Sequence, residues 1–204
     1  MSPAGGEVDT SVVRQRLHEA ALALFTTRGF ENVDLVDLCA HARLDPADVT
    51  GVYCDTRALF EDVYDTIHHE VGDAIVRSLS QTPASLLDQL FVGLHTYLHA
   101  MLDDPRRMLL VGVESGVQGR DFQVKRRDTR TIFADLIDEM ATTHVDRRIV
   151  YPGLGQITTL ALTASVHDLA LTWATMPPEQ RPSLDALVAE AVRLMKAVAL
   201  APAL

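Results

Sequence analysis

The sequence is poor in the features that cross-link a fold or anchor it in a membrane. It has only two cysteines, Cys39 and Cys54, so a disulfide framework is not expected and a reducing compartment is favoured. Its apolar runs are interrupted well short of the roughly 20 residues that a bilayer span requires, and nothing resembles a signal peptide. We therefore expect a cytoplasmic protein that is not bound to a membrane.

Positive charge is scarce as well, above all near the N-terminus. Residues 1–78 contain 14 acidic side chains and 6 arginines, a net charge of −8, and the remainder of the chain adds −2. Proteins that bind nucleic acid usually carry a basic patch, so this distribution is the reverse of the usual electrostatic footprint. It suits an acidic surface that docks on a basic protein partner.

The sequence also lacks the alternation of apolar and polar residues that marks β-strands, and it has no internal repeat. Apolar residues recur instead at spacings of three and four, the period of an amphipathic helix. This pattern predicts an all-α protein. The longer predicted helices span residues 10–28, 56–80, 85–102, 106–115, 121–143, 152–175 and 183–200.

Two short helices joined by a sharp turn are predicted between residues 33 and 57. The first has one apolar face, made by Leu35, Leu38, Cys39 and Ala42. Asp45 suits the N-cap of the second, Pro46 suits its first turn, and its apolar residues continue to Tyr53. Two short helices around a tight turn, braced by flanking helices, are typical of a helix-turn-helix.

The frame around these helices has a distinctive pattern. Its members are Leu17, Ala20, Ala21, Leu24, Phe25, Gly29, Phe30, Leu35, Asp37, Leu38, Ala42, Leu44, Val49, Tyr53 and Leu59. With these residues, the segment from Arg14 to Leu59 resembles the N-terminal domain of the TetR family of one-component transcriptional regulators. The resemblance implies an N-terminal three-helix helix-turn-helix head over residues 10–57, preceded by a disordered tail (1–9). A linker helix and a C-terminal helical body for ligand binding and dimerisation follow (58–204).

The departures from the family pattern lie where its members contact DNA. Arg43 stands at the position of the turn glycine, Thr50 where a phosphate-contacting tyrosine is common, and Thr56 where a lysine is common. Carboxylates replace neutral residues at Asp34, Asp45 and Asp48. A missing cation removes a phosphate contact, and a carboxylate repels the phosphate beside it.

The resemblance implies a regulator, most simply a repressor, that binds operator DNA as a homodimer. The candidate DNA contacts are Arg43, Thr50, Gly51, Thr56 and Arg57. The acidic head supports an alternative, in which a divergent protein of this type binds a protein partner instead of DNA.

In the resembling family, the helices of the body surround a cavity for a small molecule. Apolar cavities with a few polar groups suit hydrophobic ligands. The candidate pocket residues are Phe91, His95, Tyr97, Met101, Met108, Phe122, Phe133, His167 and Trp173. The last two helices would pair with their symmetry mates in a four-helix bundle. The candidate interface residues are Leu162, Val166, Leu169, Leu187, Ala191 and Leu194.

Two further patterns contain the residue types of metal and catalytic sites. His95 and His99 lie four residues apart, a spacing that could hold a metal, but no cysteine or carboxylate is convincingly placed beside them. Ser165, His167 and Asp168 contain the atoms of a hydrolase triad, yet neighbouring side chains on one helix diverge. We therefore expect no metal site, no cofactor and no enzymatic activity.

Overall fold

A computed structural model of the chain describes residues 9–82, 85–143 and 155–199. Helices and short turns make up these residues, and no strand occurs among them, which confirms the all-α prediction. The predicted disordered tail, apart from Asp9, lies outside the described residues, as does the predicted start of a helix at residues 152–154.

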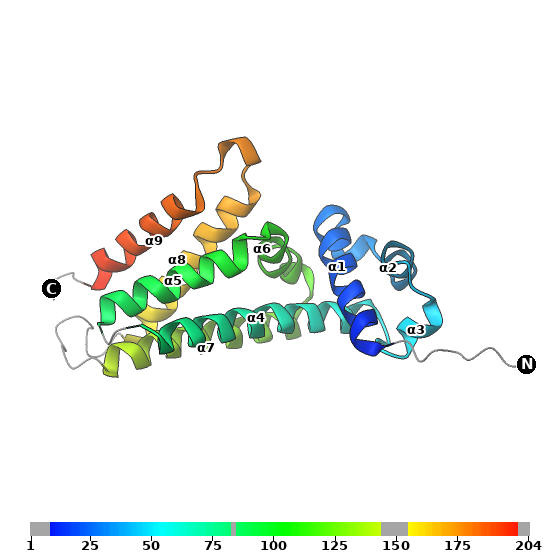
Figure 1. The fold of residues 1–204 in the computed structure, drawn as a ribbon, viewed down its shortest axis with the longest axis horizontal. Helices are drawn as coiled ribbons and strands as arrows, with labels where there is room; N and C mark the ends of the chain where they lie inside the picture. Colours follow the sequence, from blue (N-terminus) through cyan, green and yellow to red (C-terminus); the bar gives the residue numbers. More distant parts are fainter. Residues whose placement is uncertain (1–8, 83–84, 144–154, 200–204) are drawn as a thin grey trace, which may run out of the picture. The chain divides into compact units, whose positions relative to one another are not determined.

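The described chain divides into two compact units, within residues 1–67 and 68–204. The first contains four helical segments and the start of a long helix (Figure 1): α1 (Thr10–Arg28), the 3-10 turn η1 (Phe30–Asn32), α2 (Leu35–Ala42), α3 (Pro46–Thr50) and α4 (Thr56–Ser80). The boundary between the units falls inside α4, and the functional division proposed at residue 57 stays a prediction.

The second unit contains the end of α4 and the remaining segments (Figure 1). These are α5 (Leu86–Leu102), α6 (Pro105–Gly112), η2 (Glu114–Val117), α7 (Arg120–Thr143), α8 (Gly155–Thr175), η3 (Pro178–Gln180) and α9 (Leu184–Ala199). Helix α6 is shorter than predicted, because the chain tightens into the 3-10 turn η2 after Val113. No described helix is both long enough and apolar enough to cross a bilayer.

Aspartates define several helix starts. The carboxylates of Asp9, Asp34, Asp45 and Asp104 each accept a hydrogen bond from a backbone N–H group in the first turn of the following helix. Asp55 does the same for α4, at 2.7 Å from the amide nitrogen of Ala58. These caps satisfy N–H groups that have no partner within the helix, and each stabilises its helix by about 1 kcal/mol.

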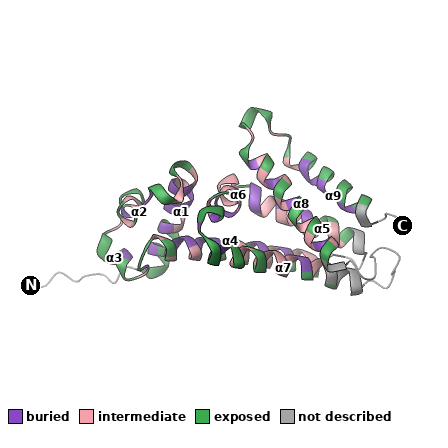
Figure 2. Ribbon diagram, turned by 180° about the vertical axis from the view of Figure 1, so that it is seen from behind, coloured by how far each residue is buried: buried purple, intermediate pink, exposed green. Residues whose placement is uncertain are grey.

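The core of the first unit contains most of the frame seen in the sequence, together with Phe60, which the frame does not include. Leu17, Leu38 and Leu59 are fully buried, and the aromatic rings of Phe25, Phe30 and Phe60 pack with centroids 5.2–5.6 Å apart. Buried positions line the inner faces of the helices in Figure 2.

In the second unit, α5 packs against α9, while α6 and α7 pack against α8. The largest fully buried side chains of this unit are Leu98, Met101, Met108, Leu110 and Phe122. Gly112 allows α6 to approach α8 closely, since a Cβ atom there would lie 2.7 Å from Cδ1 of Leu171.

Candidate functional site

The turn between α2 and α3 contains a strained residue. Arg43 adopts the left-handed conformation with φ 55° and ψ 47°, and it is the one non-glycine residue with positive φ in the part of the chain that the structure describes. The backbone N–H of Leu44 donates to the carbonyl of Cys39 at 3.0 Å, which closes the turn. An L-residue pays roughly 1–2 kcal/mol for this conformation. The turn therefore requires the left-handed backbone conformation that glycine adopts most readily, although an arginine stands at this position.

Helix α3 presents a short exposed face after this turn. Asp45 caps it and Pro46 begins it, while Val49 is buried and anchors it to the core. Thr50 and Gly51 are exposed, and the Thr50 hydroxyl donates to the carbonyl of Ala47 at 3.2 Å. The helix ends at Thr50, so the apolar residues predicted to continue it to Tyr53 lie in the following turn.

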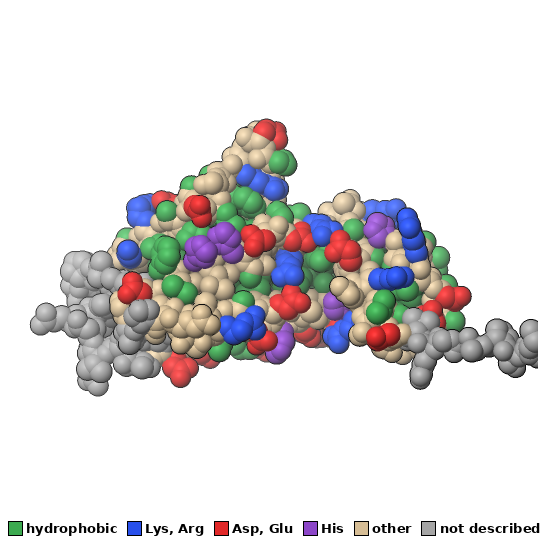
Figure 3. Space-filling model, in the orientation of Figure 1, with side chains coloured by type: hydrophobic (Ala, Val, Ile, Leu, Met, Phe, Trp, Pro, Cys, Tyr) green, Lys and Arg blue, Asp and Glu red, His purple; other side chains and the backbone are tan. Residues whose placement is uncertain are grey.

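The predicted DNA contacts differ in their surroundings. Arg43, Thr50 and Gly51 are exposed around the turn and α3. Thr56 is half-buried at the start of α4, and the Arg57 guanidinium donates to Glu61 at 3.0 Å on the same helix. On the face of the first unit seen in Figure 3, basic side chains are interspersed with acidic ones.

Two of the three carboxylates that replace neutral residues have structural roles. Asp34 accepts from the N–H of Asp37 at 2.9 Å, and the Asp37 carboxylate accepts in return from the N–H of Asp34 at 3.4 Å, which forms a capping box. Asp45 accepts from the N–H of Ala47 at 2.8 Å. Part of the acidity of the head is therefore explained by helix capping.

A polar network connects α1, the turn after α3 and α4. The Tyr53 hydroxyl donates to the carboxylate of Asp62, which also receives the Arg14 guanidinium, with its Nε at 2.7 Å. His18 Nε2 lies 2.9 Å from the same Asp62 oxygen and 3.1 Å from the Tyr53 hydroxyl. Tyr53 was a predicted frame residue, whereas His18 and Asp62 were not predicted.

The pKa values of this network follow from its geometry. Burial raises the pKa of the Tyr53 hydroxyl well above its ordinary value, and the neighbouring Asp62 carboxylate raises it further. Burial also acts to raise the pKa of Asp62, but hydrogen bonds from Tyr53, His18 and Arg14 outweigh it and hold the pKa below its usual value. Asp62 is therefore ionised at neutral pH and holds Tyr53, in the turn after α3, to α4.

In the second unit, four helices bring an aromatic and polar cluster together. The hydroxyl of Tyr97 on α5 forms a hydrogen bond of 3.3 Å with Nδ1 of His167 on α8. The ring of Phe133 from α7 lies 6.0 Å from that of Tyr97 and 6.4 Å from that of His68 on α4, measured between centroids. We refer to these four residues as the body cluster. Three of them were predicted pocket residues; His68 was not.

His167 is the electrostatically unusual member of the body cluster. Its Nε2 is buried, and no hydrogen-bond partner for it lies within the described chain. Burial, reinforced by the positive charges of Arg130 and Arg126 and by His68, lowers the pKa of His167 to about 4. The imidazole is therefore neutral at pH 7 and carries one unsatisfied nitrogen.

The other predicted pocket residues do not join this cluster. Met101, Met108 and Phe122 are core residues that are at most 1% exposed, and His95 is half-buried on α5. Phe91 contributes to a small pocket between α5 and α9, lined by Leu90, Phe91, Leu94, Val192, Met195 and Lys196.

Trp173 packs against the connection between α8 and α9. Its indole Nε1–H donates to the carbonyl of Pro182 at 2.9 Å, and the Arg181 guanidinium lies 4.9 Å from the ring centroid. On the same helix, Ser165 and Asp168 are exposed and the Ser165 hydroxyl donates to the carbonyl of Ala161, whereas Nε2 of His167 is buried. The three triad residue types do not converge.

The predicted dimer residues divide into covered and exposed side chains. Val166, Leu187 and Ala191 are at most 9% exposed within the single chain. Leu194 is 41% exposed, and Leu162 and Leu169 are half-buried. Ile157, which was not predicted, is 68% exposed near the start of α8. The exposed members are the ones left to contact a second copy, and the interface itself stays a prediction.

The chain is similar in structure to known proteins, although its sequence is not. No protein-family model and no curated protein matches the sequence. Among solved structures, a tetR-family regulatory protein from Rhodococcus RHA1 is similar at a TM-score of 0.75 and 15% identity, over 91% of this chain and 96% of that one.

Two proteins named FadR are equally similar in structure. FadR from Bacillus halodurans, a fatty acid degradation regulator, has a TM-score of 0.75 and 11% identity, over 90% of this chain and 94% of that one. FadR from Bacillus subtilis, solved in complex with stearoyl-CoA, has a TM-score of 0.75 and 12% identity, over 90% and 98%. The resemblance seen in the sequence of the head is thus confirmed at the level of structure, and the chain has the fold of the TetR-family transcriptional regulators.

Proposed function

We propose that the protein is a homodimeric transcriptional repressor of the TetR type, which acts in the cytoplasm, binds operator DNA through its head and responds to a small hydrophobic ligand in its body. The observation that carries this proposal is the tight turn at Arg43 followed by an exposed α3, within a fold that TetR-family regulators share over about nine-tenths of the chain. A dimer presents two such heads to a palindromic operator.

The head would contact DNA with few cations. Arg43 is exposed beside α3, and Arg57 can reach a phosphate only by leaving Glu61. Thr50 and Gly51 would lie against the groove. If both arginines contact phosphates, a dimer neutralises about four, and the logarithm of the affinity falls against the logarithm of the salt concentration with a slope of about −3.6.

Fluorescence anisotropy with genomic fragments, including the region upstream of the protein's own gene, tests this directly. We expect specific binding with a shallow salt slope, and Arg43→Ala should reduce the magnitude of the slope by about 2 per dimer. Arg127→Ala is the matched control, because Arg127 is an exposed arginine of α7 paired with Asp128. Absence of specific binding at low salt by an intact dimer would overturn the proposal.

The ligand would occupy the region of the body cluster. When the Tyr97 hydroxyl donates to Nδ1 of His167, the neutral imidazole carries its proton on Nε2. This N–H group would donate to a carbonyl or carboxylate of an otherwise apolar ligand. Leaving a buried donor unsatisfied costs about 1–3 kcal/mol, and a ligand that pairs with it recovers that free energy.

Long-chain acyl-CoA molecules are the first ligands to test, because stearoyl-CoA is bound by a regulator with this fold. Thermal unfolding should show a rise in Tm for the wild type with the ligand that binds, and a smaller rise for His167→Leu. His41→Leu, at an exposed histidine of α2, is the control for the loss of an imidazole.

The response to the ligand would pass along α4. This helix begins in the DNA-binding unit and ends in the unit that contains the body cluster, so a ligand that shifts α4 changes the spacing of the two heads in the dimer. The same ligand should then alter DNA affinity in the anisotropy assay, and His167→Leu should bind DNA without responding to it.

A further inference from the structure

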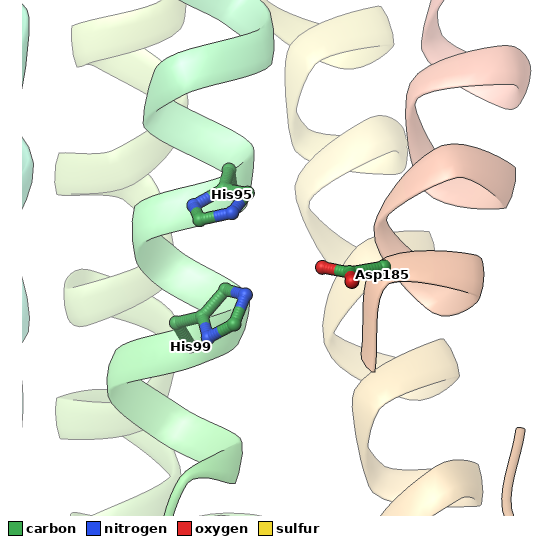
Figure 4. A group of neighbouring side chains, drawn as sticks. All are labelled: His95, His99 and Asp185. Carbon is green, nitrogen blue, oxygen red and sulfur yellow. The ribbon is translucent and has the colours of Figure 1, made fainter. Parts of the chain in front are cut away.

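Two histidines and an aspartate from different helices meet in the second unit. His95 and His99 lie one turn apart on α5, and Asp185 lies in the first turn of α9. One potential ligand atom from each residue lies within 4.8 Å of the other two. Figure 4 shows the Asp185 carboxylate pointing from α9 towards the two imidazole rings. The acidic partner that the sequence did not place beside the histidines is therefore supplied by the last helix.

The orientation of His99 makes one of its nitrogens available. Its Nδ1 is 3.3 Å from a carboxylate oxygen of Asp103, one turn further along, so this nitrogen carries the proton and donates. Its Nε2 is buried and has no hydrogen-bond partner within the described residues. Metal-binding histidines usually donate one ring N–H to a carboxylate and bind the metal through the other nitrogen. Asp103 and Nε2 of His99 fit these two roles.

The two imidazoles are already neighbours. Their rings stack with centroids 4.2 Å apart on one regular helix, so the backbone already holds the two imidazoles side by side. Tetrahedral zinc ligands lie about 3.3 Å apart, given bonds of ~2.0–2.1 Å. Rotations of the half-buried histidines and the exposed Asp185 would close the remaining gap.

We propose that His95, His99 and Asp185 bind a divalent first-row transition metal such as Zn²⁺, with Asp103 as the positioning residue of His99. Imidazole nitrogens select such metals over Mg²⁺ and Ca²⁺, which prefer oxygen ligands. The carboxylates of Asp185 and Asp103 balance the double positive charge. Three protein ligands leave a fourth position for water. The metal would hold the start of α9 to α5, and this binding does not depend on the proposed DNA function.

Isothermal titration calorimetry of the full-length protein, purified without a histidine tag and stripped of metal, tests the site with ZnCl₂. We expect one Zn²⁺ per chain and no binding of Mg²⁺. His95→Ala and Asp185→Asn should weaken Zn²⁺ binding by at least about 100-fold, and Asp103→Asn by about 10-fold. Asp185→Asn keeps the shape of the side chain, and circular dichroism checks that each variant remains folded.

His69→Ala is the matched control. His69 forms a comparable pair with Asp73 one turn away on α4, at 3.6 Å, but it does not belong to the three-residue group. This variant should bind Zn²⁺ as the wild type does. Two further readouts should distinguish the same variants. The ligand-field absorption of bound Co²⁺ should be retained in the wild type and His69→Ala and lost in His95→Ala and Asp185→Asn. Zn²⁺ should raise the Tm of the wild type, and Asp185→Asn should abolish that rise. No Zn²⁺ binding by the wild type, or wild-type affinity for Zn²⁺ in His95→Ala and Asp185→Asn, would overturn the proposal.

Discussion

The Tyr53 hydroxyl donates a hydrogen bond to the Asp62 carboxylate, and this contact holds the turn after α3 to α4. Three side chains converge on that carboxylate, from Tyr53, His18 and Arg14. Because Asp62 is only 24% exposed, removing it leaves polar partners without an acceptor in a partly dehydrated place. The Asp62 carboxylate therefore helps to hold the turn after α3 against α4.

Asp62→Ala should lower the free energy of unfolding by about 2–3 kcal/mol, because Tyr53, His18 and Arg14 all lose their shared acceptor and only the contact between His18 and the Tyr53 hydroxyl remains. Tyr53→Phe removes one donor while His18 and Arg14 still satisfy the carboxylate, so we expect a loss of about 1 kcal/mol. Urea denaturation measures both. Glu61→Ala, at the neighbouring carboxylate paired with Arg57, should change stability by less than about 0.5 kcal/mol. Equal losses for Asp62→Ala and Glu61→Ala would contradict the network.

Arg43→Gly should raise the free energy of unfolding by about 0.5–1 kcal/mol, because glycine adopts a φ of 55° without the steric cost that arginine pays. Arg43→Ala keeps that cost, so its stability should match the wild type. If Arg43 contacts a phosphate, both variants weaken DNA binding to a similar degree. A glycine variant that is no more stable than the alanine variant would show that the turn is not strained.

His167 should make the protein sensitive to mild acid. The pKa of His167 in the folded protein is about 4, below the value of 6.5 for an unperturbed histidine. Between these values the unfolded chain binds a proton that the folded protein does not, so stability falls as the pH falls from about 6.5 to about 4. At roughly 1.4 kcal/mol per pH unit, the loss across this window approaches about 3 kcal/mol.

Urea denaturation at pH 7.5 and pH 5 checks this dependence. His167→Gln cannot titrate in this range, so the difference in stability between the two pH values should shrink. His41→Gln, at an exposed histidine, should leave the difference as it is in the wild type. Asp62 also loses its contribution in acid, but its lowered pKa places that loss below the ordinary carboxyl value of 3.8. The two effects are therefore separable by pH.

Leu194→Glu should convert the proposed dimer to a monomer. Leu194 is 41% exposed on α9, so a charge there would not disturb the core of one chain but would be buried without a partner in an interface. Light scattering after size-exclusion chromatography measures the mass. Val124→Glu is the control, since Val124 is 46% exposed on α7. A dimer that survives Leu194→Glu and dissociates with Val124→Glu would place the interface elsewhere.

Much of the head could be predicted because its signals are local. The caps at Asp45 and Asp55 and the glycine stop at Gly29 act within a few residues of each helix end, and the structure has helix ends at these places. The length of α3 was overestimated, because Val52 and Tyr53 continue the apolar pattern while the backbone has already left the helix. Burial of Tyr53 at 7% exposure explains that pattern equally well.

The net charge of the head overstates how strongly its carboxylates would repel DNA. Net charge counts Asp34 and Asp45 as repulsive, yet both neutralise the positive ends of helices through backbone N–H groups. A sequence-level signal did exist, since aspartate directly before a helix start is a common cap. This signal predicts the cap at Asp45, and the structure shows the same role for Asp34.

By itself, the sequence determined the all-α class, the ends of most helices and the buried frame of the head, because periodicity and capping are properties of neighbouring residues. Tertiary structure alone decided which side chains meet across helices: Asp62 with His18, Tyr97 with His167, and Asp185 with His95. Those meetings depend on how each helix is rotated and how far it slides along its neighbour. Many weak packing contacts between distant segments set that register, and no local pattern records it.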